Sequence, residues 1–149
     1  MNAGLLNDPA FRTYATCSAI LAVKMLLSGT YTSLMRVRHK GFVNEEDARA
    51  FAPGTASGAV EHPAVAHALR IQRNDGENIP PFFAIGLIFV LSGASPFGAA
   101  AYCWTFTVAR LVHTVVYLAR LQPWRALAYL TGYLCILGMA VQIAFGLVK

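Results

Sequence analysis

Two long segments of this chain contain no formally charged residue, and they limit what the chain can fold into. The first covers 32 residues, 78–109, and is broken only by the turn-forming stretch 92–96; the second covers 23 residues, 126–148. A helix needs about 20 predominantly apolar residues to cross the hydrocarbon core of a bilayer. A soluble helical core would instead need polar outer faces on several helices, and residues 126–148 provide none. These segments therefore predict a membrane protein.

The composition supports this prediction. Of the 149 residues, 56% are hydrophobic and only 13% are charged, whereas about a quarter of a typical soluble domain is charged. The shortage of charge disfavours a disordered chain, a coiled coil and a conventional soluble enzyme. The length fits a single domain. We predict an all-α fold, a four-helix transmembrane bundle formed by residues 1–149, with spans at about 11–35, 64–91, 97–120 and 124–148.

The basic residues predict how the bundle is oriented. With four spans, one side of the membrane collects Arg36, Arg38, Lys40, Arg49, Arg70, Arg73, Arg120 and Arg125, and the other has only Arg12 and Lys149. The positive-inside rule places the 36–62 loop and the 120–125 turn in the cytoplasm. We therefore expect a multi-pass protein of the endoplasmic reticulum or of a bacterial inner membrane. Its basic side suits anionic lipid headgroups, and we expect no nucleic-acid partner.

Two polar stripes with the same spacing point to a ligand site. The second span carries polar residues at i, i+3, i+4 and i+7, and these are Arg70, Arg73, Asn74 and Glu77. The third span repeats the spacing with Arg110, His113, Thr114 and Tyr117. Each set shares one helix face, and ionisable residues within spans mostly face the bundle interior or a cavity. An ion pair would explain any one of these residues structurally, but eight on two faces favour a binding site.

The side chains of these stripes indicate which ligand they suit. Arginines bind carboxylates or phosphates through two parallel hydrogen bonds, and Glu77 suits an amine. The sequence has no glycine-rich phosphate loop, and its histidines and cysteines lack metal-ligand spacing, so we expect no metal. A zwitterionic peptide with two carboxylates and one amine, such as glutathione, matches this set. An arginine beside the glutathione sulfur would favour the thiolate by lowering the pKa of the thiol.

Four motifs carry a resemblance to a known family. They are Arg73–Phe82 (RNDGENIPPF) with Arg70 before it, Phe42–Ala48 (FVNEEDA), Ala109–Leu118 (ARLVHTVVYL) and Trp124–Leu127 (WRAL). In this order and spacing they resemble the MAPEG family, the membrane-associated proteins in eicosanoid and glutathione metabolism. The resemblance extends from about residue 24 to about residue 142.

The resemblance implies a homotrimer that binds glutathione between neighbouring subunits near the cytoplasmic face. By the match, the residues that contact glutathione are Arg70, Arg73, Asn74, Glu77, His113, Tyr117 and Tyr129, with Arg36 or Arg38 from the adjacent subunit. Arg125 corresponds to the arginine that stabilises the thiolate, and Asp47 to an aspartate with a catalytic role in the prostaglandin E synthase branch. Arg110 and Thr114 match structural and site-lining positions.

The function that we expect from the resemblance is that of a membrane-bound glutathione transferase active in detoxification, with glutathione peroxidase activity. Its hydrophobic substrate would enter from the bilayer. One alternative is a glutathione-dependent prostaglandin E synthase, and a second is a non-catalytic lipid-binding member of the family. In the synthase branch a serine follows the arginine of the fourth helix, whereas this chain has Ala126, which favours the transferase. A small four-helix exporter would want a carboxylate in the first span, where this chain has Lys24.

Overall fold

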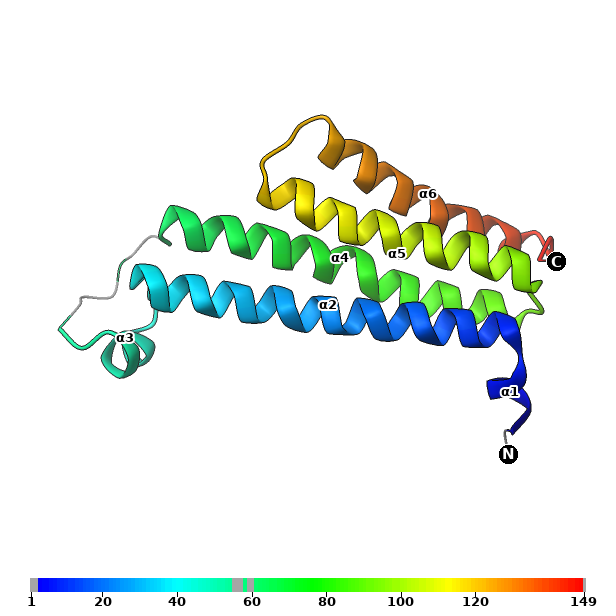
Figure 1. The fold of residues 1–149 in the computed structure, drawn as a ribbon, viewed down its shortest axis with the longest axis horizontal. Helices are drawn as coiled ribbons and strands as arrows, with labels where there is room; N and C mark the ends of the chain where they lie inside the picture. The colour runs from blue at the N-terminus through cyan, green and yellow to red at the C-terminus, as the bar shows by residue number, and fades with distance from the viewer. Residues whose placement is uncertain (1–2, 55–57, 59–60, 149) are drawn as a thin grey trace. The chain divides into compact units, whose positions relative to one another are not determined.

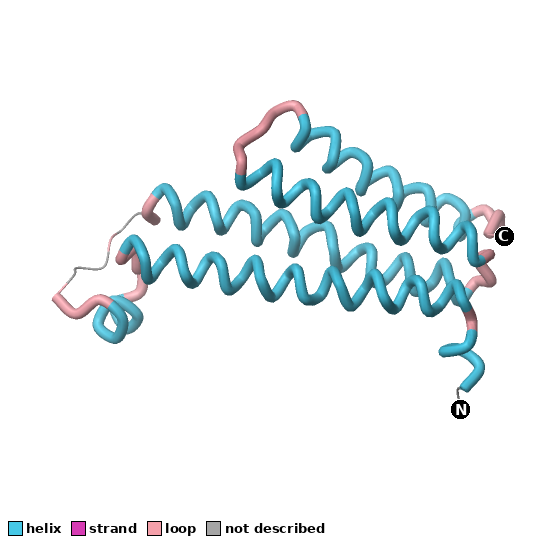
Figure 2. Tube along the Cα trace, in the orientation of Figure 1, coloured by secondary structure: helices cyan, strands magenta, loops and turns pink. Residues whose placement is uncertain are grey.

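The computed structural model of this chain describes residues 3–54, 58 and 61–148. All the regular structure in these residues is helical, which confirms the predicted all-α class. The helices are α1 (Ala3–Asn7), α2 (Pro9–His39), α3 (Glu45–Phe51), α4 (Pro63–Leu91), α5 (Pro96–Leu118) and α6 (Trp124–Ala144) (Figure 1). The four long helices coincide with the predicted spans, and short loops join α4 to α5 and α5 to α6 (Figure 2). The predicted 36–62 loop contains α3, and its residues 55–57 and 59–60 lie outside the described part.

Two of the long helices end earlier than predicted, because a left-handed residue follows each. Helix α6 stops at Ala144 rather than at 148, since Gly146 has a φ of 63° and the Leu147 N–H donates back to the Gln142 carbonyl at 2.8 Å. Helix α5 stops at Leu118 rather than at 120, where Arg120 has a φ of 58°. A left-handed residue closes a helix by redirecting the chain after the last turn, and glycine adopts this conformation at the lowest cost.

The described chain divides into two compact units. One contains Met1–Lys24 and Glu77–Lys149, and the other contains Met25–Gly76. Helices α2 and α4 therefore each contribute a segment to both units. Helix α4 stays helical through both of its internal prolines, Pro80 and Pro81.

Aromatic packing and buried polar contacts hold the first unit together. The rings of Phe82 and Phe106 stack with centroids 4.4 Å apart. Helices α5 and α6 run side by side (Figure 1), and Gln142 Nε2 donates to the Tyr102 hydroxyl at 2.7 Å. Gly138 makes this contact possible, because a Cβ there would lie 2.9 Å from the Tyr102 ring. All three cysteines of the chain, Cys17, Cys103 and Cys135, are buried in this unit with free thiols.

The second unit has two small apolar clusters and one buried polar contact. Met35, Val65 and Ala68 form the first cluster, with Tyr31 and Leu69 packed against it. Phe42, Ala48 and Ala52 form the second, which anchors α3. The Ser28 hydroxyl donates to Asp75 Oδ2 at 2.6 Å between α2 and α4.

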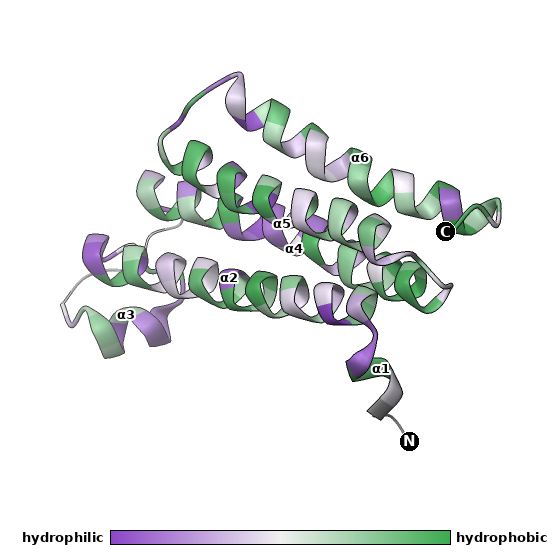
Figure 3. Ribbon diagram, turned by 45° about the vertical axis from the view of Figure 1, so that its right-hand side comes forward, coloured by the Kyte–Doolittle hydropathy of each residue, from purple (hydrophilic) through white to green (hydrophobic). Residues whose placement is uncertain are grey.

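Helices α2 and α6 are long and apolar enough to cross a membrane by length and composition, which supports two of the four predicted spans. Helices α4 and α5 carry the polar stripes, which lower their average hydrophobicity, and their crossing stays a prediction. In Figure 3 α6 is hydrophobic or neutral along most of its length, whereas α3 has strongly hydrophilic segments. Several large apolar side chains of α5 and α6 are exposed, among them Val112, Val115, Leu127, Leu130 and Leu134. Such a surface indicates contact with lipid or another protein chain.

Candidate functional site

The polar stripe of α5 lies largely in the interior of the first unit. Arg110 has no exposed surface and His113 is also buried. The Thr114 hydroxyl donates to the Arg110 carbonyl at 3.3 Å, one turn back along the helix. Arg110 packs against Gly132 of α6, since a Cβ there would lie 3.5 Å from Arg110 Cδ, an ordinary van der Waals contact. Arg110 therefore belongs to the contact between α5 and α6.

Helix α6 brings a second arginine to this stripe. The Arg125 guanidinium lies over the Tyr117 ring, with Cζ 4.5 Å from the ring centroid. The His113 ring meets the same tyrosine edge-on, with centroids 5.5 Å apart. We call these three residues the His113–Tyr117–Arg125 stack. A cation within about 6 Å of an aromatic ring is attracted to the ring face, so Tyr117 holds the guanidinium in place while part of it stays accessible.

The position of Arg125 at the start of its helix bears on which ligand charge this site can stabilise. It lies in the first turn of α6, which begins at Trp124. The N-terminus of a helix carries a partial positive charge and disfavours a cation by about 0.3–1 kcal/mol. The Arg125 N–H already donates to the Leu121 carbonyl at 3.2 Å and the Leu127 N–H to the Pro123 carbonyl at 3.1 Å. The guanidinium, together with the positive end of the helix dipole, would therefore be the group that stabilises an anion placed there. This end of α6 is therefore suited to bind and stabilise a negatively charged atom.

Tyr129 lies one turn further along α6, four residues after Arg125, and thus on the same face of the helix. Its side chain is exposed, and its ring stacks with that of Tyr133 at a centroid distance of 6.5 Å. The sequence analysis did not select Tyr133. The i, i+4 spacing of the two tyrosines is the signal that would have suggested it.

Helix α4 carries the other predicted stripe. Arg70, Arg73 and Glu77 are exposed and Asn74 is half-buried. Because α4 is helical over the whole stretch, these four residues share one face, as predicted.

The sequence analysis missed Asp75. Only 1% of its surface is exposed, and its carboxylate accepts the Ser28 hydrogen bond. A buried carboxylate is costly unless it is hydrogen-bonded or paired, so this contact is part of what fixes α4 against α2 in the second unit. The signal was present in the spacing, because Asp75 is in register with the buried Ala68 and Ile71 rather than with the polar stripe.

The three predicted site residues that precede α4 lie in different surroundings. Arg36 Nη2 binds Glu61 Oε1 at 3.2 Å, and both side chains are partly buried. Arg38 is exposed at the end of α2, and Asp47 is half-buried in the first turn of α3. Arg36 is thus already engaged by a carboxylate within the second unit.

Comparison with known proteins places these residues in a family context. A model of the MAPEG family matches residues 14–145. The chain is 37% identical to Prostaglandin E synthase of Bos taurus over 142 residues, which cover 95% of this chain and 92% of that protein. It is also 37% identical to Microsomal glutathione S-transferase 1 of Homo sapiens over 148 residues, which cover 97% of this chain and 93% of that protein. Overall identity does not separate the two kinds of relative.

Proposed function

Because the chain belongs to the MAPEG family, we propose that it is a membrane-bound glutathione transferase that also has glutathione peroxidase activity. One observation carries this proposal: Arg125 lies in the first turn of α6 with its guanidinium held over Tyr117. This arrangement suits the stabilisation of a thiolate. The nucleophile then belongs to glutathione, and no cysteine of the chain takes part.

The residues of this chain stabilise the deprotonated, negatively charged form of the glutathione sulfur. The Arg125 guanidinium and the positive end of the α6 dipole lower the pKa of the glutathione thiol, and its proton leaves to solvent. The thiolate sulfur then forms a bond to an electrophilic carbon of the hydrophobic substrate, and the leaving group departs with its electron pair. In the peroxidase reaction the thiolate sulfur bonds to the terminal peroxide oxygen as the O–O bond breaks, and the alkoxide takes a proton from solvent to leave as the alcohol. The thiol of a second glutathione then attacks the oxidised sulfur, which forms the disulfide and releases the oxygen as water.

The remaining polar residues are proposed to bind the rest of glutathione. The proposed set is Arg70, Arg73, Asn74, Glu77, His113, Tyr117 and Tyr129. Arginines suit the two carboxylates and Glu77 suits the amine. Of the two candidates from an adjacent subunit of a homotrimer, Arg38 is favoured over Arg36, because Glu61 already binds Arg36. Arg110 is assigned a structural role, because it is completely buried.

We further propose that residues 1–149 form one integral-membrane domain in which α2, α4, α5 and α6 all cross the bilayer. The 36–62 loop, the α5–α6 connection and the glutathione site would face the cytoplasm. The distribution of basic residues supports this orientation, and the exposed apolar side chains of α5 and α6 support contact with lipid.

Two assays on one purified preparation separate the transferase from a prostaglandin E synthase. The match of Asp47 to the aspartate of the synthase branch and the synthase relatives favour the second activity, but Ala126 has no hydroxyl beside Arg125. We expect glutathione to produce thiolate absorbance in the ultraviolet, and a chlorodinitrobenzene to be conjugated faster than prostaglandin H is isomerised. The reverse order would assign the chain to the synthase. No glutathione binding in calorimetry would revive the non-catalytic lipid-binding alternative.

Replacing Tyr117 tests how the stack works. Tyr117→Leu removes the ring under the Arg125 guanidinium, and we expect kcat to fall about tenfold, in line with a cation–π contact of about 1–2 kcal/mol. Tyr117→Phe keeps the ring face and is expected to retain most of the turnover. Thiolate absorbance as a function of pH checks both variants, because a purely structural defect would not move the pKa of bound glutathione. Equal losses in the two variants would show that the hydroxyl matters rather than the ring.

A further inference from the structure

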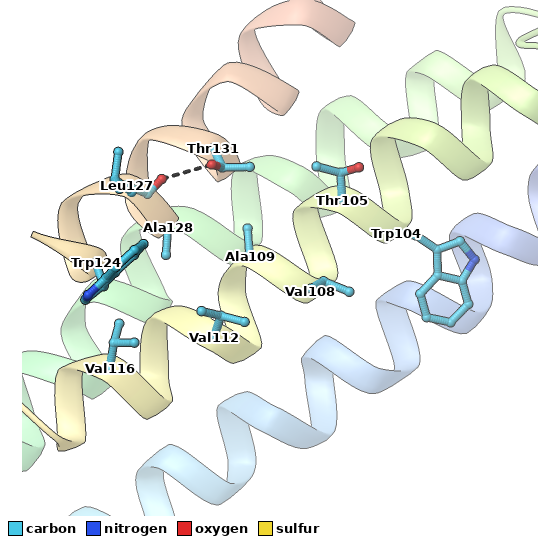
Figure 4. A pocket seen from close by; sticks show the side chains of 10 residues that line it. All are labelled: Trp104, Thr105, Val108, Ala109, Val112, Val116, Trp124, Leu127, Ala128 and Thr131. Atoms are coloured by element: carbon cyan, nitrogen blue, oxygen red, sulfur yellow. Dashed lines mark hydrogen bonds between the residues drawn. The ribbon is translucent and has the colours of Figure 1, made fainter. Parts of the chain in front are cut away.

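Helices α5 and α6 form an apolar groove on the first unit, distinct from the His113–Tyr117–Arg125 stack. It has a volume of about 560 Å³ and is lined mainly by Trp104, Val108, Val112, Val116, Trp124 and Leu127. Figure 4 shows Trp104 and Trp124 near its opposite ends. The Thr131 hydroxyl at the groove donates to the Leu127 carbonyl at 2.9 Å and so is satisfied within α6 (Figure 4). The groove therefore offers an apolar surface to an apolar occupant.

The length of the groove suits an extended chain. Its α5 wall runs from Trp104 to Val116, which spans about 18 Å at the rise of an α-helix. A compact ligand would leave much of such a wall uncovered, whereas a long acyl chain would follow it.

Two arginines of the chain, Arg120 and Arg125, are close in sequence to Val116 and Trp124, which line one end of the groove. Arg120 lies in the connection between Val116 and Trp124, is exposed, and no residue after Glu77 in the chain is acidic. Arg125 is already placed over Tyr117. Arg120 is thus the cation available to an anionic group at this end.

The backbone at Arg120 fixes where its side chain leaves α5. Its φ is 58°, and the Leu121 N–H donates to the Val116 carbonyl at 2.9 Å, which closes α5. Left-handed backbone costs a side-chain-bearing residue about 1–2 kcal/mol, so glycine would serve this turn better. Lys40 after α2 has the same conformation, with a φ of 50°, so this geometry belongs to a helix end, and it places the exposed Arg120 side chain at the end of α5.

We propose that this groove binds an anionic phospholipid, with an acyl chain along α5 and α6 and the headgroup phosphate at Arg120. Guanidinium groups pair with phosphate through directed hydrogen bonds. The anionic leaflet of a membrane faces the cytoplasm, which is the side proposed above for the α5–α6 connection. The site is separate from glutathione binding and holds a lipid of the membrane rather than a substrate.

The two tryptophans of the chain allow a direct test, because both line the groove. The protein is placed in phosphatidylcholine vesicles that contain increasing fractions of phospholipid with brominated acyl chains, which quench tryptophan fluorescence on contact. We expect brominated phosphatidylglycerol to reach half-quenching at a mole fraction about fivefold lower than brominated phosphatidylcholine. Glutathione is absent from this measurement, so its outcome is independent of the proposed transferase activity.

Matched variants identify the residue responsible. Arg120→Gln is expected to abolish the preference for the anionic lipid, whereas Arg12→Gln, at the opposite end of the predicted topology, keeps it. Arg120→Gly is expected to lose the preference while the protein unfolds at no lower temperature, because glycine relieves the backbone. Val112→Phe fills the groove and should weaken quenching by both lipids.

Three results would overturn the proposal. Equal quenching by the two lipids would mean ordinary contact with bulk lipid. A preference that survives in Arg120→Gln would place the headgroup elsewhere. No quenching by either lipid would mean that protein, such as a second copy of the chain, covers the groove.

Discussion

Replacing Arg125 by alanine is expected to lower the turnover of glutathione conjugation by about 100-fold or more, the usual loss when one preorganised charge-stabilising group is removed. The guanidinium is the charged group that the structure holds over Tyr117 at the start of α6. Without it, glutathione would remain a thiol near neutral pH, because the helix N-terminus alone contributes about 0.3–1 kcal/mol. The thiolate absorbance seen on adding glutathione should disappear together with the turnover.

Two further variants test which property of Arg125 is needed and serve as controls. Arg125→Lys keeps a positive charge but loses the planar group that covers the ring, so we expect turnover between those of the wild type and the alanine variant. Arg12→Ala removes an exposed arginine of α2 and should leave kcat and KM unchanged. Unchanged conjugation by a folded Arg125→Ala variant would show that Arg125 does not stabilise the thiolate.

Replacing Arg110 by alanine is expected to cause a large loss of stability. The side chain has no exposed surface and lies against Gly132 in the contact between α5 and α6. Its truncation leaves a cavity in this contact, and removing a large buried side chain costs about 3 kcal/mol or more in protein interiors. Thermal unfolding in detergent should therefore begin several degrees lower.

Arg49→Ala is the matched control for this experiment. Arg49 forms an ion pair with Glu45 at 2.7 Å, but 78% of its side chain is exposed. Exposed pairs of this kind contribute little to stability, so the unfolding temperature should barely change. Equal stability of Arg110→Ala and Arg49→Ala would contradict the structural role assigned to Arg110.

The long helices were predictable because their signals are local. Uncharged segments of at least 20 residues and polar residues at i, i+3, i+4 and i+7 depend only on the helical repeat. The contact between His113 and Tyr117 follows from the same repeat. The approach of Arg125 to Tyr117 does not, because it depends on how α5 and α6 pack, and sequence spacing alone contains no such information.

Other features were missed because their determinants are short or distant in the sequence. Helix α3 has only seven residues and rests on the small cluster of Phe42, Ala48 and Ala52. The pairing of Arg36 with Glu61 joins residues 25 positions apart. Asp75 was not predicted because the predicted site residues of α4 lie on its polar face, whereas this carboxylate lies on the buried face.

The burial of all three cysteines bears on how this protein would meet oxidative stress. Mixed disulfides form by thiol–disulfide exchange at accessible thiols, and Cys17, Cys103 and Cys135 are each less than a tenth exposed. Glutathione disulfide, the product of peroxide reduction, would find no surface thiol to modify. The chain can therefore work in a shifting redox environment without becoming glutathionylated itself, and its activity would follow the supply of reduced glutathione rather than the oxidation state of the protein.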